Sequence, residues 1–160
     1  MQCCLSVKFT ASVCDLTSSS QRLQLIDTVS SILNGTLNIL VNNAVTLTLK
    51  GAIEYTTEDY NYMMSTNIEA PYHLSQINLE MIWDNIRINT VASWRVRTTI
   101  SKPDAAVVEE YGRLIGWTPA GRIGEPEEIL SMVAFLCLLT ASYISEQIIC
   151  VDGGFTADGW

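Results

Sequence analysis

The chain has 160 residues, of which 48% are hydrophobic and 16% are charged, and its formal net charge is -8. This much apolar surface can offset the entropy of ordering, so the composition predicts a folded domain and excludes an intrinsically disordered segment. Only 9 Lys and Arg residues stand against 17 Asp and Glu residues. That balance disfavours binding to a nucleic acid or to an anionic membrane, because both partners require clustered basic side chains.

The cysteines and the single histidine do not form the pattern of a metal site. No Cys-x-x-Cys pair occurs, and His73 is the only imidazole that could join the cysteines, so we expect no bound metal. We interpret the cysteines as small buried side chains in a reducing compartment and His73 as a packing residue. The cysteines are Cys3, Cys4, Cys14, Cys137 and Cys150.

The sequence shows neither a targeting segment nor a membrane span. The N-terminus has no basic region followed by a long apolar stretch, so we expect no signal peptide. The apolar run Met132–Leu139 is too short to cross a bilayer. These observations predict a cytoplasmic protein.

In chain order, the first elements predict a βαβ unit. Ser6–Cys14 partly alternates in polarity and is expected to be a strand that ends at Asp15. The next segment is expected to be a helix that ends at Asn34-Gly35. Leu37–Val41 is nearly all apolar, which is typical of a strand buried on both faces of a parallel sheet. The apolar positions of the helix are Leu23, Ile26, Val29 and Leu33.

The second half predicts two further helices and two further strands. A start that resembles a capping box at Thr56–Asp59 opens a helix to about Gln76. Pro126 suits the first position of a helix to about Leu139, where Glu127 and Glu128 would face the positive end of the dipole. Residues 92–124 are rich in loop residues, although 104–115 could hold a helix. The expected strands are Ile86–Val91 and Gln147–Val151.

Five segments resemble, in the right order, motifs of the short-chain dehydrogenase/reductase family, and the plant tropinone-reductase-like branch is most similar. They are the turn Asn42-Asn43-Ala44 after an apolar strand, Ser65-Thr66-Asn67, and the segments 84–92, 122–128 and 149–154. The resemblance implies an α/β fold in a single partial domain over 1–160. It also implies an incomplete Rossmann-like, doubly wound parallel sheet.

In the family, these positions surround a nicotinamide cofactor, and the resemblance implies NADP(H). Asn67 matches the catalytic Asn that orders a water near the family's Lys. Val45 stands where the family has a glycine after the Asn-Asn-Ala turn. The positions that match cofactor-binding residues are Asp15, Asn42, Asn43, Ala44 and Thr98.

The family's proton-transfer groups have no counterpart here. A Tyr activated by a Lys four residues later is expected, but the residues four before Lys8, Lys50 and Lys102 are Cys4, Thr46 and Thr98. The glycine fingerprint T-G-x-x-x-G-x-G is also absent from these 160 residues. We therefore expect the first two strands and the fifth strand to be missing, with an internal deletion near 76–84. Unpaired strand edges should make the fold weakly stable.

Three functions remain open at this point. The first is a tropinone-reductase-like oxidoreductase by descent that has lost catalytic activity. The second is a competent NADP-dependent reductase of a small carbonyl substrate in which other groups replace Tyr and Lys. The third is a non-catalytic interaction module that forms homo- or hetero-oligomers with full-length relatives. The substrate cannot be named, because the family's variable substrate loop falls within residues 93–120.

Overall fold

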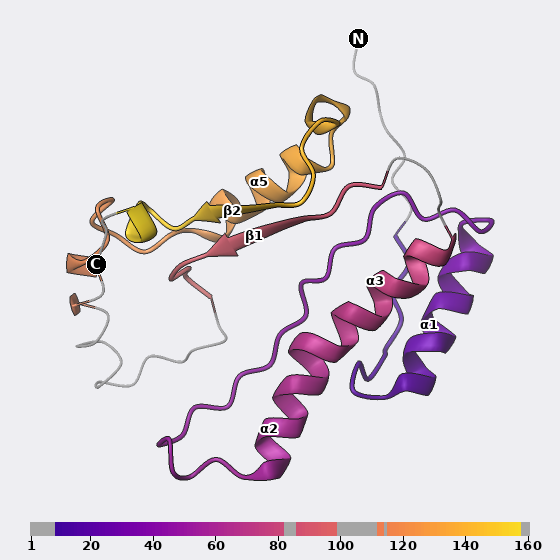
Figure 1. Cartoon of the computed structure of the whole chain (residues 1–160), viewed down its shortest axis with the longest axis horizontal. Helices are drawn as coiled ribbons and strands as arrows, with labels where there is room; N and C mark the ends of the chain where they lie inside the picture. Colours follow the sequence, from indigo (N-terminus) through magenta and orange to yellow (C-terminus); the bar gives the residue numbers. More distant parts are fainter. Residues whose placement is uncertain (1–8, 82–85, 99–111, 114, 158–160) are drawn as a thin grey trace. The chain divides into compact units, whose positions relative to one another are not determined.

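The computed structural model describes residues 9–81, 86–98, 112–113 and 115–157. It divides into two compact units, residues 1–84 and 85–160. The described part of the first unit contains helices and long extended stretches, whereas the second contains a parallel strand pair and one longer helix (Figure 1). The chain is thus an incomplete Rossmann-like α/β fold.

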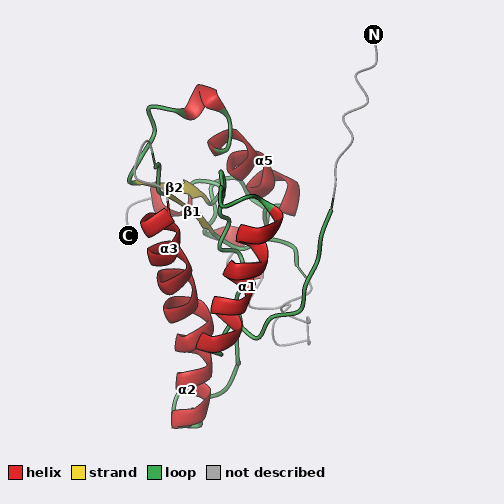
Figure 2. Ribbon diagram, turned by 90° about the vertical axis from the view of Figure 1, so that its right-hand side faces the viewer, coloured by secondary structure: helices red, strands yellow, loops and turns green. Residues whose placement is uncertain are grey.

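The predicted first helix forms as α1, which spans Ser19–Ile32. At its start the Ser18 hydroxyl accepts a hydrogen bond from the amide of Gln21. At its end Asn34 and Gly35 have φ values of 52° and 76°, a left-handed conformation that stops the helix. In Figure 2, α1 lies beside α3, and the two helices are in contact.

One long helical rod follows, composed of α2 (Thr57–Met64), the π-helical turn η1 (Ser65–Glu69) and α3 (Ala70–Met81). The predicted capping box is confirmed, since Thr56 and Asp59 each bond the other's backbone amide through their side chains. The rod continues beyond the expected end near Gln76. The π turn comes just before Pro71, whose ring would otherwise press on a carbonyl of the preceding helical turn.

Neither of the two strands predicted for the first unit forms among the described residues. Neither the described part of the first one, residues 9–14, nor Leu37–Val41 belongs to a ladder. Residues 6–8 lie outside the described residues. A strand needs a hydrogen-bonded neighbour, and the described residues of this unit offer none, so apolar and extended sequence alone produces no sheet.

The βαβ arrangement predicted for the first elements is found in the second unit instead, where the two strands predicted there pair in parallel. β1 (Asn89–Ser93) pairs in parallel with β2 (Gln147–Val151), from Asn89 opposite Gln147 to Ser93 opposite Val151. The predicted bounds of β2 are confirmed, whereas β1 begins and ends a little later than the predicted Ile86–Val91. Of the helix suggested at 104–115, residues 112, 113 and 115 are helical, and the remainder lies outside the described residues.

The helix between the strands, α5, spans Pro126–Leu136 and ends earlier than predicted. It begins with Pro126 at its first turn, and Glu125 and Glu128 form a reciprocal capping box. The Arg122 guanidinium donates to both carboxylate oxygens of Glu128 at 2.8 and 2.7 Å, and the Glu125 amide donates to one of them at 2.8 Å. The Arg122 hydrogen bonds, followed by that amide, lower the pKa of Glu128 from 4.5 to about 2.

This carboxylate predicts a pH dependence for the second unit. Because its folded pKa lies below its ordinary value, it stabilises the fold above pH 4.5, and this contribution is lost as the pH falls toward 2. We expect Glu128→Gln to flatten that part of the stability curve. Thermal unfolding of both proteins between pH 2 and pH 6 would test this, and two parallel curves would contradict it.

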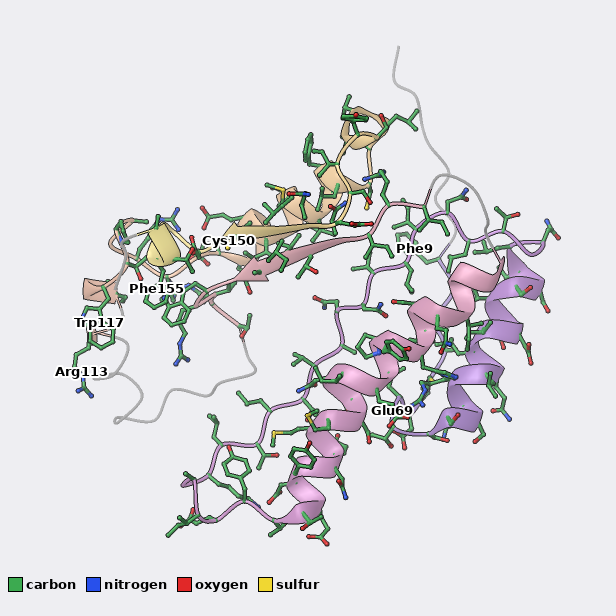
Figure 3. The ribbon with its side chains drawn as sticks, viewed as in Figure 1. Phe9, Glu69, Arg113, Trp117, Cys150 and Phe155 are labelled. Carbon is green, nitrogen blue, oxygen red and sulfur yellow. The ribbon has the colours of Figure 1, made fainter. Side chains whose placement is uncertain are left out.

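Few apolar side chains are fully covered. Among the described residues the buried hydrophobic ones are Ala70, Leu74 and Ala141. Cys150 on β2 is exposed, so the interpretation of the cysteines as buried is wrong for this thiol (Figure 3). Cys3 and Cys4 lie outside the described residues. Much of the apolar surface that the composition provides is therefore not used in the core.

Candidate functional site

Asn67, the residue predicted to be catalytic, lies in the π turn η1 and is half-buried. Its side-chain nitrogen Nδ2 donates to the Thr46 carbonyl at 2.8 Å, and its Oδ1 accepts from the Thr46 amide at 2.9 Å. Both polar atoms of the amide thus bind one residue of the extended stretch. In this geometry Asn67 replaces the backbone partner that an adjacent strand would provide.

The predicted cofactor-binding turn Asn42-Asn43-Ala44 lies on the same extended stretch and is exposed. Asn42 Nδ2 donates to the hydroxyl of Ser75 on α3 at 3.2 Å. The turn therefore contacts the helical rod through Ser75, and Asn67 is itself part of that rod. Asn43 and Ala44 make no side-chain contact that would define a cofactor pocket among the described residues.

Asp15 lies in the loop before α1 and is exposed. Its Oδ1 accepts from the hydroxyl and the amide of Thr17 at 2.8 and 2.9 Å. These two hydrogen bonds lower the pKa of the Asp15 carboxyl below its ordinary value. The carboxylate orders its own loop, and this local role accounts for its position without a nucleotide.

A buried arginine, which the sequence did not predict, joins the elements of the first unit. Arg22 on α1 is only 2% exposed. Its guanidinium donates to the Leu16 carbonyl and to Glu69 Oε1, both at 2.6 Å, and its Nε donates to His73 Nδ1 at 3.3 Å. Glu69 is marked on the rod in Figure 3. His73 therefore has a structural partner here, as expected of a packing residue.

Thr98 belongs to the second unit and is exposed. It follows a short parallel bridge between Val96 and Gly124, beside Arg97, whose Nε donates to the Glu125 carboxylate at 3.1 Å. In the same unit the rings of Trp94 and Phe155 stack with centroids 3.7 Å apart. The segment after β1 is thus held by the Trp94–Phe155 stack and by the Val96–Gly124 bridge, and Thr98 is at its exposed end.

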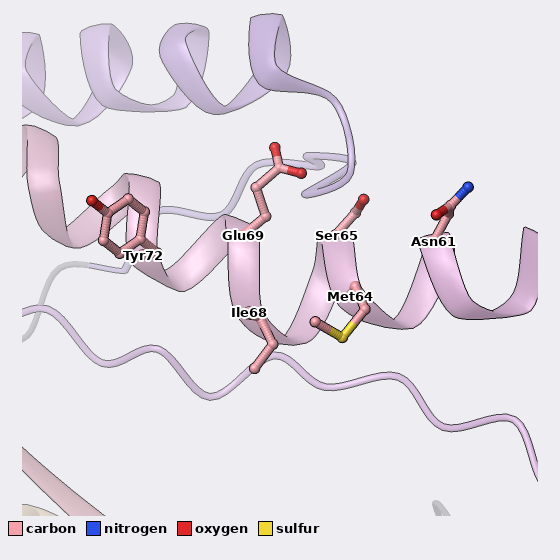
Figure 4. Close-up of a pocket in the computed structure, with 6 residues that line it drawn as sticks. All are labelled: Asn61, Met64, Ser65, Ile68, Glu69 and Tyr72. Carbon is pink, nitrogen blue, oxygen red and sulfur yellow. The ribbon is translucent and has the colours of Figure 1, made fainter. Parts of the chain in front are cut away.

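A pocket of about 310 Å³ lies along the rod of the first unit. Figure 4 shows that its lining side chains come from α2, η1 and α3. They are Asn61, Met64, Ser65, Ile68, Glu69 and Tyr72. None of the predicted site residues is among those that line it.

The described residues do not fit the pyrophosphate of a dinucleotide. A phosphate is usually held at a free helix N-terminus opened by glycines. Here the starts of α1, α2 and α5 are occupied by Ser18, Asp59 and Glu128, and the two carboxylates would repel an anion. Gly35 closes a helix and Gly51 lies in a turn, so the described part of the first unit has no glycine cradle.

Two other site types receive no support from the described residues. No helix among them is both long and apolar enough to span a membrane. Within the same residues, no cluster of at least three His, Cys, Asp or Glu side chains has the arrangement of a metal site.

Two family models match the chain. The short chain dehydrogenase model matches residues 2–94, and a model described as enoyl-(acyl carrier protein) reductase matches residues 77–156. Together they account for nearly the whole sequence. The Rossmann-like elements described above therefore belong to matched regions.

Relatives and solved structures agree with these matches. Senescence-associated protein 13 from Arabidopsis thaliana is 39% identical over an alignment of 196 positions, gaps included. This alignment covers 94% of this chain and 72% of that protein. A tropinone reductase homologue from Datura stramonium is 38% identical, covering 96% of this chain and 75% of the homologue. A gluconate 5-dehydrogenase from Burkholderia cenocepacia, solved with NADP and tartrate, superimposes with a TM-score of 0.76 at 20% identity, covering 89% and 73% of the two chains.

The alignment with the Arabidopsis protein is longer than this chain, so that relative has residues inside the matched region without a counterpart here. The family models and the identities of these relatives nevertheless define the ancestry of the chain. The chain belongs to the short-chain dehydrogenase/reductase family of oxidoreductases, in its tropinone-reductase-like branch.

Proposed function

We propose that this chain is an oxidoreductase by descent that does not itself reduce a carbonyl substrate. The observation that carries this proposal is the absence of any Tyr with a Lys four residues later. A phenol without a neighbouring ammonium keeps an ordinary, high pKa and is a poor proton donor at neutral pH. The extra residues that the relatives carry inside the matched region support a deletion near 76–84, where that pair would belong.

The geometry of the remaining positions supports the same proposal. Asn67 uses both polar atoms on Thr46, so its amide is not free to order a catalytic water. The capped helix starts of the described residues oppose phosphate binding. In intact relatives NADPH would supply the hydride, and a small ketone would accept it. Here Asp15, Asn42, Asn43, Ala44 and Thr98 are the only matched positions left to contact the cofactor.

The test is an assay of NADPH oxidation by the purified full chain with a panel of small ketones. The Datura homologue serves as the intact comparison. We expect a rate equal to the buffer blank, because loss of the proton donor alone commonly lowers catalysis by a factor of about 10² to 10⁴. NADPH fluorescence should likewise show no saturable binding. Turnover above the blank that requires the chain would refute the proposal.

A second candidate is a non-catalytic subunit that associates with full-length relatives. It is favoured by the apolar side chains that line the pocket on the rod, since Met64, Ile68 and Tyr72 are 39%, 57% and 69% exposed. Exposed apolar stripes of this kind are typical of helix-packing surfaces. Co-expression with a tagged full-length relative would show a stable complex that Ile68→Asp abolishes. Independent migration of the two proteins would exclude this function.

A further inference from the structure

We infer that the extended segment Leu37–Leu49 is a self-association surface that pairs antiparallel with the same segment of a second copy. The segment contains no charged residue, no proline and no glycine, although the chain carries a net charge of -8. It is therefore a place where two acidic copies can approach without direct repulsion between charges. The inference does not depend on whether the chain retains catalytic activity.

One edge and one face of this segment are already used by its own unit. Within the segment, Asn42 bonds Ser75 and Thr46 bonds Asn67, and just after it Lys50 bonds Asp59. Because the partners on the rod occur in descending order, the segment runs antiparallel to the rod (Figure 1). The spacing is physically consistent, because four extended residues and eight helical residues both span about 12–13 Å. The segment is thus held straight along the helix.

The backbone N–H and C=O groups of the even-numbered residues lie on one edge of the segment, and those of the odd-numbered residues lie on the other. In an extended chain the N–H and C=O of one residue point to one edge, and those of the next residue point to the other. The even residues Thr46 and Thr48 give their carbonyls to Asn67 and to the Tyr55 hydroxyl. For the odd residues no backbone partner exists among the described residues. Their edge is therefore available for a further strand.

The side chains of the odd residues form an exposed apolar row. All of its apolar members from position 39 onward are between 50% and 67% exposed. A row of this kind beside unpaired backbone groups is the surface to which another strand adds. The row consists of Ile39, Val41, Val45, Leu47 and Leu49.

The symmetry of the sequence around Asn43 indicates that the added strand is the same segment of a second copy. Read outward from Asn43 in both directions, the odd positions match in character. An antiparallel pair centred on Asn43 would place Val41 opposite Val45, Ile39 opposite Leu47, Leu37 opposite Leu49, and Asn43 opposite itself. Such an arrangement has a two-fold axis and is closed, as most homodimers are. The apolar cross-strand pairs would stabilise it.

The experiment measures the oligomeric state of the full chain by sedimentation over a range of concentrations. We expect a monomer–dimer equilibrium, and Val45→Asp should raise its dissociation constant about a hundredfold, because the change occurs twice in a symmetric dimer. The matched control is Ile148→Asp, an equally drastic change at a 74% exposed position on β2, which should leave the equilibrium unchanged. A monomer at all concentrations, or equal effects of both substitutions, would overturn the inference.

Cysteine cross-linking tests the register independently of folding defects. The tryptic peptide Leu23–Lys50 contains no native cysteine, so any disulfide on it reports an introduced thiol. Asn43→Cys should link to itself between copies, since directly paired Cα atoms lie about 5.5 Å apart, within disulfide range. Val41→Cys alone should not, because the two copies of position 41 would lie about 13 Å apart. A 41–41 link, or no 43–43 link in the dimer, would contradict this pairing.

Discussion

Arg22→Ala should lower the free energy of unfolding of the first unit by about 3 kcal/mol or more. The side chain is 2% exposed and bonds the Leu16 carbonyl, the Glu69 carboxylate and the His73 ring. Its removal leaves a cavity and releases the loop before α1 from α3. A unit with so few buried apolar side chains has little other packing to compensate for that loss.

Amide hydrogen exchange of α1 and α3, followed by mass spectrometry, measures this effect within the first unit. The matched control is Arg22→Met, which fills most of the volume without a charge. Because the Glu69 side chain is 57% exposed and can be solvated, Arg22→Met should cost only about 1–2 kcal/mol. If Arg22→Ala left the protection of both helices unchanged, the buried cluster would not be what joins them.

The helix ends could be predicted from the sequence because their causes are local. The stop at Asn34-Gly35, the capping pair Thr56 and Asp59, and the conformation fixed by Pro126 each act within about one turn of the helix end that they determine. The strands depend on neighbours that are distant in sequence. Gln147–Val151 finds such a neighbour in β1, whereas Leu37–Val41 is equally apolar but has none among the described residues and forms no ladder.

The same distinction applies to the site. The family motif identified Asn67, but its bond to Thr46 depends on how an extended stretch lies along a helix, which no local pattern encodes. Arg22 did carry a signal, because it precedes Ile26 by one helical turn on the apolar side of α1. A charged residue in that position indicates a buried partner. Glu69 and His73 are one turn apart on the rod, which makes them the natural acceptors.

Gly153→Ala should destabilise the second unit by about 2–4 kcal/mol, through two additive causes. Gly153 has a φ of 64°, which a Cβ disfavours. That Cβ would also lie 2.9 Å from Cγ2 of Thr118, a side chain only 5% exposed, and 3.0 Å from Cβ of Ala120. Because Gly153 follows β2 and its carbonyl accepts the Ala120 amide at 2.9 Å, the distortion should reach the strand pair.

Gly121→Ala separates the two causes. Gly121 has nearly the same φ, 67°, but a Cβ there would meet no atom within 4 Å, so only the backbone cost of about 1 kcal/mol remains. Amide exchange of β1 and β2 in both variants measures the difference, which we expect to be at least about 1 kcal/mol. Equal loss of protection would mean that the buried Thr118 and its neighbours yield to the added methyl group. The contact around the Asp152-Gly153-Gly154 turn would then be loose packing and not a rigid attachment of β2.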